Sequence, residues 1–420
     1  MKLKRSLALV LTLLMLLPCF LTAVSALDEE GDWLVHESQI NENGYVCTRE
    51  TMKSTYGTRS VRTCTFDQQG RLLKEVDMNV EGSDSRFGST KTCTYNKAGN
   101  LVTEAYSFSS TDGFFEKYLA VYTYDKKDRL IKETLTMQHE EGTDVSVRTL
   151  TYDAKGNKTG AVVEQRQADG ITMRDVYTYA YDKQNRVVKA SCKSASSIDL
   201  LKNETVKYTY KNGRLVKEYA VEESGFLPYL SKLKKTTTHA YDNKGNELKT
   251  VYRETSDDGF WKTETTKRTF DKQKRLLTET IVRKDSYGTT QKSNEVFTFD
   301  KNGFLTKHTK VEKDNDGVSS KLTETFVNDK KGNPVKKTTA ETNFGDTTKT
   351  TEIISYDKKG RESTHKTTVR SQDGSVTRYT NAYTYDKAGN AVKTLVTIKD
   401  AEGTGKEVYT GTYQKVKAAA

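Results

Sequence analysis

The sequence predicts an all-β protein, built from antiparallel β-hairpin repeats with a period of about 29 residues that form a spiralling or elongated solenoid-like sheet. The first observation behind this prediction is an aromatic anchor, usually followed by Asp, that returns along the chain. The intervals between anchors are 28 or 29 residues in all cases but one, which is 31. The anchors are Phe66, Tyr95, Tyr124, Tyr152, Tyr181, Tyr210, Tyr241, Phe270, Phe299, Tyr356, Tyr385 and Tyr413, with Asn328 in the same place. A fixed period in this range is typical of a repeat architecture.

The segment before each anchor predicts a strand. Residues 121–124 read Val-Tyr-Thr-Tyr, so both tyrosines lie on one face of an extended chain and the smaller residues on the other. Tyr, Thr, Val and Phe all favour a half-buried pleated surface.

The segment after each anchor predicts a tight turn. Its pattern is Asp-x-x-Gly, in which Asp opens a type I turn and Gly accepts the left-handed conformation that closes the hairpin. Asp128, Asn185 and Lys274 stand where Gly is usual. An apolar pair such as Leu130-Ile131 then begins the next strand.

A second turn lies halfway through the repeat and is often Asp-Gly, as at 112–113 and 258–259. Each repeat is therefore one long hairpin, and the chain is a meander of roughly 26 strands. A sheet of that size curls. We expect it to spiral with the Tyr/Leu face inward and the Thr/Lys/Glu face in water.

The chain divides into four parts. Residues 1–26 are a secretory signal peptide, with Lys2, Lys4 and Arg5 ahead of an apolar run that ends at Ala26. Residues 27–40 form an N-terminal cap segment, 41–417 the array of about 12–13 hairpin repeats, and 418–420 a tail. No later stretch has the roughly 18 apolar residues of a membrane helix. We therefore expect a secreted, extracellular or cell-surface protein with no transmembrane span in the mature chain.

The charge pattern predicts a solvated surface of mixed sign. The formal net charge of the whole chain is +11, and basic and acidic residues alternate along it rather than cluster. Nucleic-acid binding needs a basic stripe on one face, so no nucleic-acid partner is expected. The excess of positive charge gives a mild preference for anionic partners such as cell-wall polymers.

The repeated phrases "YTYDKKDRL", "YTYDKAGNAV" and "SYDKKGRES" resemble the YD repeats of bacterial Rhs-type proteins. The resemblance implies a coiled antiparallel sheet, which in larger members forms a hollow shell around a toxin domain. The period of 29 residues exceeds the roughly 20 typical of YD repeats. After Tyr413 only "QKVKAAA" remains, so a toxin cargo within this sequence is not expected.

Four cysteines remain after the signal peptide: Cys47, Cys64, Cys93 and Cys192. Cys47 and Cys64 fall on adjacent strands of the first hairpin, where a disulfide would staple the end of the array. The alternative is that the cysteines are small core hydrophobes, because Cys64 and Cys93 both stand two residues before an anchor.

No catalytic or metal-binding constellation is present in the sequence. The five histidines are scattered, and no His or Cys pair has zinc-ligand spacing. We therefore expect no enzyme activity, no metal and no cofactor. His239 falls on the anchor face and is interpreted as a core substitution.

The hairpin tips carry the sharpest sequence signal for binding. Bulky residues follow the turn glycine in some repeats only: Phe114, Phe115, Phe226, Tyr229, Phe260 and Trp261. Such aromatics could stack on sugar rings or anchor a protein, or turn inward and pack. The main hypothesis is a non-enzymatic binding or adhesion scaffold at the cell envelope, with a carbohydrate or protein ligand. The alternatives are an Rhs-like shell that encapsulates or delivers a separately encoded effector, and a structural spacer.

Overall fold

The computed structural model describes residues 44–55, 57–81, 85–315, 317–343 and 345–416. These residues form 26 β-strands in a single sheet. The strands carry the alternating Thr, Val, Tyr and Phe residues that fit a pleated surface. Most are about ten residues long, and neighbours along the chain are neighbours in the sheet.

The strands are, in order, β1 (Tyr45–Ser54), β2 (Arg59–Phe66), β3 (Leu72–Glu81), β4 (Ser85–Tyr95), β5 (Leu101–Ser110), β6 (Phe115–Tyr124), β7 (Leu130–His139), β8 (Gly142–Tyr152), β9 (Lys158–Arg166), β10 (Thr172–Tyr181), β11 (Val187–Ser196), β12 (Leu200–Lys211), β13 (Arg214–Phe226), β14 (Tyr229–Tyr241), β15 (Glu247–Ser256), β16 (Trp261–Phe270), β17 (Leu276–Asp285), β18 (Thr290–Phe299), β19 (Leu305–Asp314), β20 (Gly317–Asn328), β21 (Pro334–Asn343), β22 (Asp346–Tyr356), β23 (Glu362–Arg370), β24 (Val376–Tyr385), β25 (Ala391–Lys399) and β26 (Thr404–Lys415).

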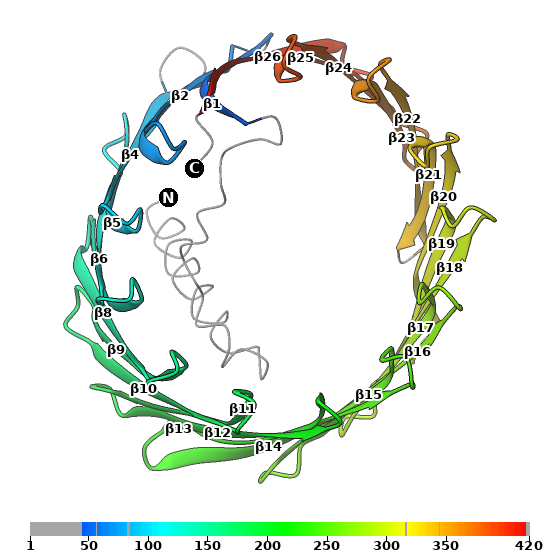
Figure 1. Ribbon diagram of the computed structural model, residues 1–420. Coiled ribbons are helices and arrows are strands. Elements are labelled where there is room, and N and C mark those ends of the chain that lie inside the picture. Colours follow the sequence, from blue (N-terminus) through cyan, green and yellow to red (C-terminus); the bar gives the residue numbers. More distant parts are fainter. Residues whose placement is uncertain (1–43, 56, 82–84, 316, 344, 417–420) are drawn as a thin grey trace.

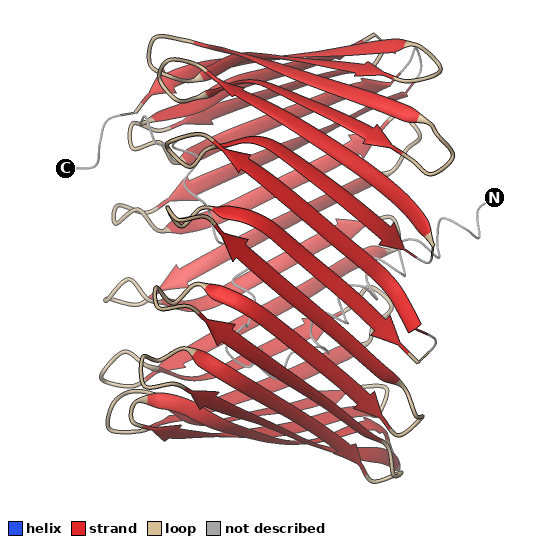
Figure 2. Ribbon diagram, turned by 90° about the vertical axis from the view of Figure 1, so that its right-hand side faces the viewer, coloured by secondary structure: helices blue, strands red, loops and turns tan. Residues whose placement is uncertain are grey.

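The sheet closes on itself. Strand β26 pairs antiparallel with β1, from Tyr45 opposite Lys415 to Ser54 opposite Glu407. The Val416 amide donates a hydrogen bond to the Gly44 carbonyl at 3.1 Å, beyond the last strand pair. The result is an antiparallel barrel without an edge, seen along its axis in Figure 1. In Figure 2 the strands run obliquely to that axis, as closure requires.

The predicted spiralling or elongated solenoid is therefore wrong. The all-β hairpin content is as expected, but one circuit uses every hairpin and the last strand meets the first. The physical reason is that closure depends on the summed twist and curvature of all 26 strand pairs. A single repeat shows how its two strands pair, but not where the last strand of the chain arrives.

The Asp-x-x-Gly turns adopt the predicted conformation. At the turn between β6 and β7, the Asp128 amide donates to the Asp125 carbonyl at 3.1 Å, and the strand register shifts between Thr123 and Tyr124. Asp128 has φ 59° and Lys274 has φ 66°, the left-handed conformation that Gly takes in the other copies. The three substitutions for Gly thus keep the turn, and Lys274 does so with the least suitable side chain.

The two faces of the sheet differ in exposure. In β6, Ala120 and Tyr122 are 3% and 4% exposed, whereas Leu119 and Val121 on the opposite face are 45% and 36% exposed. Side chains converge on the concave side of a closed sheet and diverge on the convex side, so the buried set is the inner face. The turns at the near end of Figure 1 curl toward the barrel interior, and their side chains contact this same face. We call the opposite, more exposed set the outer wall.

The barrel has no thick hydrophobic core. Most of its buried apolar residues form two groups on the inner face, one from β1 to β6 together with Val416, and the other from β10 to β13. Among the described residues, no helix is long and apolar enough to cross a membrane, a finding that does not bear on strands.

Candidate functional site: the inner face of the barrel

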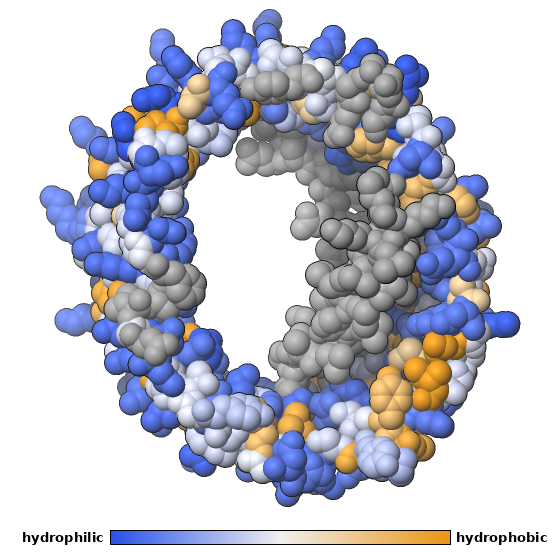
Figure 3. All heavy atoms as spheres, turned by 180° about the vertical axis from the view of Figure 1, so that it is seen from behind, coloured by the Kyte–Doolittle hydropathy of each residue, from blue (hydrophilic) through white to orange (hydrophobic). Residues whose placement is uncertain are grey.

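The barrel encloses a wide central opening. With 26 strands, a strand spacing of about 4.8 Å and a tilt of about 40° give a backbone diameter of roughly 50 Å. The described side chains leave the centre of the ring open in Figure 3. Barrels of 16–18 strands already hold an aqueous channel, so this ring can hold a wider one.

The anchors tie each hairpin to the one before it. The Tyr124 hydroxyl donates to the Leu101 carbonyl at 2.8 Å, and the Tyr152 hydroxyl to the Leu130 carbonyl at 2.9 Å. The Arg129 guanidinium also lies over the Tyr152 ring, 4.6 Å from its centroid. Equivalent hydroxyl–carbonyl bonds are made by Tyr95, Tyr181, Tyr210, Tyr356, Tyr385 and Tyr413. These bonds thus join neighbouring hairpins at one end of the barrel.

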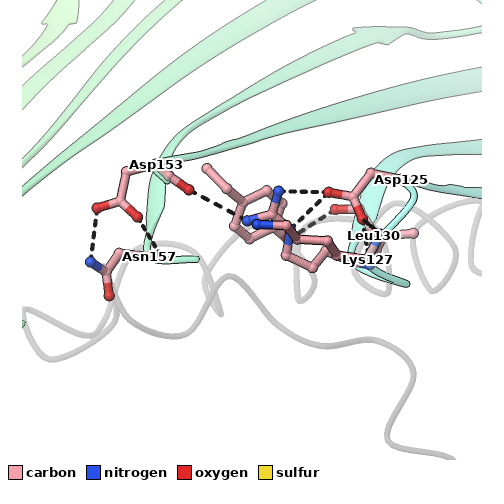
Figure 4. A network of polar contacts seen from close by, with 7 residues as sticks. Asp125, Lys127, Leu130, Asp153 and Asn157 are labelled. Carbon is pink, nitrogen blue, oxygen red and sulfur yellow. Dashed lines mark hydrogen bonds and ion pairs between the residues drawn. The ribbon is translucent and has the colours of Figure 1, made fainter. Parts of the chain in front are cut away.

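The turn aspartates complete this arrangement. One Asp125 carboxylate oxygen accepts from the backbone amides of Lys127 at 2.8 Å and Arg129 at 3.0 Å, and the other accepts from Arg129 Nε at 2.8 Å. The amide and side chain of Arg129 both favour the charged carboxylate, so the pKa of Asp125 is lowered from its ordinary value. In the next turn Asn157 Nδ2 replaces the guanidinium and donates to Asp153 at 2.8 Å. Figure 4 shows these neighbouring turns.

A band of carboxylates and cations crosses the inner face from β18 to β23. His308 bridges Glu295 at 3.3 Å and Glu324 at 2.9 Å, and Lys337 bridges Glu324 at 2.7 Å and Glu352 at 3.8 Å. We call this band the glutamate ribbon, made of Glu295, His308, Lys310, Glu324, Lys337, Glu352, Glu362 and His365. His365 continues it by contacting Glu352 at 3.0 Å and Glu362 at 3.3 Å, and Lys310 lies 3.8 Å from Glu295.

A shorter band runs from β13 to β17. His239 lies 3.5 Å from Glu218 and 2.6 Å from Glu247, and Arg268 joins Glu247 to Glu279, each at 2.5 Å. His239, predicted as a core substitution, lies on the inner face, where it contacts these two carboxylates and its ring stacks on that of Tyr241, with centroids 6.4 Å apart.

These bands make the inner face polar and, in the glutamate ribbon, acidic. The ribbon holds four glutamates and two lysines, together with two histidines. No group of three or more His, Cys, Asp or Glu residues among those described could hold a metal ion. The arrangement can orient water and concentrate cations.

The sequence missed both bands because their members come from different strands. Glu324 and Lys337 are cross-strand neighbours on β20 and β21, separated by a turn. The available signal was the presence of charged residues at anchor-face positions, as at His308, Lys310 and Glu312 on β19, which are two residues apart.

The predicted tip aromatics divide into two locations. Phe226, Tyr229 and Trp261 are 55%, 85% and 40% exposed, on the adjacent β13–β14 and β15–β16 hairpins. Phe260 is half-buried with its ring 5.7 Å from that of Tyr287, an 83% exposed residue that the Asp-Gly pattern did not reveal.

The other two tip aromatics, Phe114 and Phe115, are half-buried on the distant β5–β6 hairpin. Phe114 packs edge-on against Phe108, with centroids 5.8 Å apart. The structure therefore does not unite the six residues. Ligand binding at these tips stays a prediction.

The cysteines are thiols in the structure. Cys64, Cys93 and Cys192 are buried and Cys47 is half-buried. Cys47 and Cys64 lie on the paired strands β1 and β2 as expected, and their disulfide stays a prediction. The signal peptide, residues 27–40 and the 418–420 tail lie outside the described residues.

The prediction of a surface of mixed charge is wrong about where the charges lie. Because neighbouring side chains of a strand point to opposite faces, charges that alternate along the sequence are separated onto the two faces. Strand β7 shows this: Glu133 lies on the inner face and Lys132 on the outer wall. An outer wall rich in threonine and lysine also differs from the apolar band of a lipid-embedded barrel.

Comparisons with known proteins give low similarities. No protein-family model and no curated protein matches the chain. Among solved structures, the P pilus usher (PapC) translocation pore is 8% identical, with 88% of this chain and 98% of that chain covered and a TM-score of 0.37. A porin-like protein from Bacteroides uniformis is 14% identical, with 58% and 95% covered and a TM-score of 0.22. At these values the conclusions rest on the barrel itself.

The closed barrel corrects the predicted functions. The binding or adhesion scaffold was predicted for a spiralling or elongated array, whereas the structure is a closed ring. The prediction of a soluble secreted binding protein is therefore wrong. The comparisons also give no support to the resemblance to YD repeats.

The predicted partners and location change as well. The prediction of no transmembrane span relied on the lack of a long apolar segment, and a closed barrel removes that basis, because strands of about ten residues can cross without one. Of the predicted locations, the cell envelope is retained, since closed antiparallel barrels of 8 to 26 strands are an architecture of that compartment.

Proposed function

We propose that the chain forms a wide, hydrophilic pore of the cell envelope, acting as a passage rather than as a catalyst. The observation that carries the proposal is the β1–β26 seam, which turns the sheet into a ring around an open centre. An open array would have two exposed edges, whereas the closed ring has an inside and an outside with different chemistry.

The rim supports a fixed opening. The hydroxyls of eight anchor tyrosines hold the backbone of the preceding hairpin, and several turn arginines stack on the next anchor. Phe299 has no hydroxyl, and there Arg275 stacks on the ring. These contacts set the spacing between most of the hairpins.

The glutamate ribbon supports a preference for cations. Its excess of carboxylates lies on the concave side of a large barrel, where fixed charges of one sign raise the local concentration of counter-ions. Small cations and hydrophilic cationic solutes are the expected cargo.

Dye uptake by cells tests the proposal. Cells exporting the protein should take up a hydrophilic cationic dye faster than an anionic dye of equal size, and both faster than cells without the protein. Replacing Glu295, Glu324 and Glu352 by Gln should reduce the cation preference several-fold while leaving neutral-dye uptake unchanged.

The matched control makes the same change on the outer wall, with Glu164 and Glu223 replaced by Gln. It should leave the preference unchanged. If exporting cells take up each dye no faster than cells without the protein, although electron microscopy shows intact rings, the pore proposal is wrong.

A further inference from the structure

The outer wall carries charge of nearly one sign. Eight exposed lysines occupy equivalent positions, each opposite the residue that precedes an anchor, and we call them the lysine row: Lys74, Lys132, Lys189, Lys217, Lys249, Lys307, Lys336 and Lys393. Within the described strands, the carboxylates at outer-wall positions are Glu164 and Glu223. Glu164 already pairs with Arg174 at 3.2 Å, and Glu223 with Lys232 at 2.6 Å.

Lysines also face one another directly across strand pairs of the outer wall. The pairs are Lys189 with Lys207, Lys249 with Lys267, and Lys292 with Lys313. Like charges directly opposite each other destabilise a sheet. No carboxylate of the described residues forms an ion pair with these six ammonium groups, so an anion from outside the chain would relieve the repulsion.

The row runs around the whole ring. Its members lie on β3, β7, β11, β13, β15, β19, β21 and β25, so neighbouring lysines are separated by two or four strand spacings, or roughly 10 to 20 Å. A flat bilayer surface or a globular protein would contact one sector of such a wall, whereas a flexible polymer can follow it round.

We propose that the outer wall binds a flexible phosphodiester polymer of the polyol-phosphate type, running around the barrel. Lysine ammonium groups bind phosphate as compact point charges, and a polymer supplies such groups at repeated intervals. On six of the eight strands the next outer residue is small or β-branched, namely Val76, Thr134, Ser191, Val251, Thr309 and Thr338, and on the other two it is Tyr219 and Leu395. Apart from Tyr219, these residues offer no ring for stacking nucleic-acid bases, and the predicted signal peptide places the chain outside the cytoplasm.

Binding of purified protein to synthetic poly(glycerol phosphate) tests this inference, independently of passage through the ring. The affinity should fall steeply between about 50 and about 200 mM salt, because binding releases counter-ions. Replacing Lys189, Lys207, Lys249 and Lys267 by Gln should weaken binding about tenfold and flatten the salt dependence. The variant should fold, since it removes like-charge pairs.

The matched control replaces four exposed turn lysines, Lys127, Lys183, Lys244 and Lys301, by Gln, with the same loss of charge. Near-unchanged binding by this control supports the proposal, and an equal loss in both variants overturns it. Double-stranded DNA of equal charge and anionic phosphatidylglycerol vesicles form the other two arms. Tighter binding to DNA would overturn the proposal in favour of a nucleic-acid surface, and tighter binding to vesicles in favour of a membrane surface.

Discussion

At the scale of single residues, the Asp-x-x-Gly turn does more than reverse the chain. Arg129 binds Asp125 of its own turn and lies over Tyr152 of the next hairpin, so one side chain links two repeats. Where Asn replaces Arg, as at Asn157, the bond to the aspartate remains, but the side chain has no guanidinium to lie over the next ring. The repeats therefore differ in how firmly they hold their neighbours.

Replacing Arg129 by Ala should lower the free energy of unfolding by about 1–2 kcal/mol, through loss of a charge-assisted hydrogen bond and a cation–π contact. Urea unfolding followed by circular dichroism measures the change. Lys127→Ala, at an exposed position of the same turn, should change it by less than about 0.5 kcal/mol. Equal effects of the two substitutions would show that the contacts of Arg129 with Asp125 and Tyr152 do not stabilise the fold.

Acid should weaken the barrel through the same turns. The pKa values of Asp125, Asp182 and Asp357 are lowered, first because the backbone amide of the turn arginine donates to each carboxylate. A lowered folded-state pKa gives stability that is present above the ordinary aspartate value near 3.9 and is lost as pH falls through the folded value.

Thermal unfolding at a series of pH values measures this effect. The melting temperature should be flat from pH 7 to about 5 and fall below about 4. A variant with all three aspartates replaced by Asn should show a shallower acid decline. An equally steep decline of the melting temperature in the variant would mean that other carboxylates cause the loss of stability in acid.

At the scale of strands and turns, much of the fold can be predicted because the signals are local. The alternation at Tyr122 and Tyr124 and the turn at Asp125 involve residues within a few positions of one another, and the structure has both. Closure and the glutamate ribbon could not be predicted, since Tyr45 meets Lys415 only after a full circuit and Glu324 meets Lys337 only through strand register.

The separation of charge could have been predicted but was not. Lys132 and Glu133 are adjacent in the sequence and lie on opposite faces. Considered along the chain they indicate a mixed surface. Considered at every second residue, as the strand geometry requires, they indicate an acidic interior and a basic outer wall.

The antiparallel seam can form only with an even number of strands, because neighbouring strands alternate in direction. Deleting residues 404–416 removes β26 and leaves β25 beside β1, two strands that run in the same direction and cannot form the antiparallel seam. We expect open or aggregated molecules, because exposed edges pair with other chains. Size-exclusion chromatography with light scattering measures this outcome, and closed monomeric rings would contradict it.

At the scale of the whole molecule, the corresponding control is to remove an even number of strands. Deleting residues 96–124 joins Tyr95 to Asp125, removes β5 and β6, and restores the anchor–turn sequence at the junction. The 24 remaining strands keep the antiparallel order, so the ring should close with a diameter about 8% smaller. Electron micrographs of single particles would show the narrower ring beside the wild type.

The seam has one more consequence. Gly44 and Val416 are joined by a hydrogen bond of 3.1 Å, so a short linker could connect them without strain. The chain could then be cut at an Asp-x-x-Gly turn instead, and the same ring would form from a gene that starts in the middle. The gene thus sets the order in which the hairpins are synthesised, while the folded ring itself has neither a first repeat nor a last.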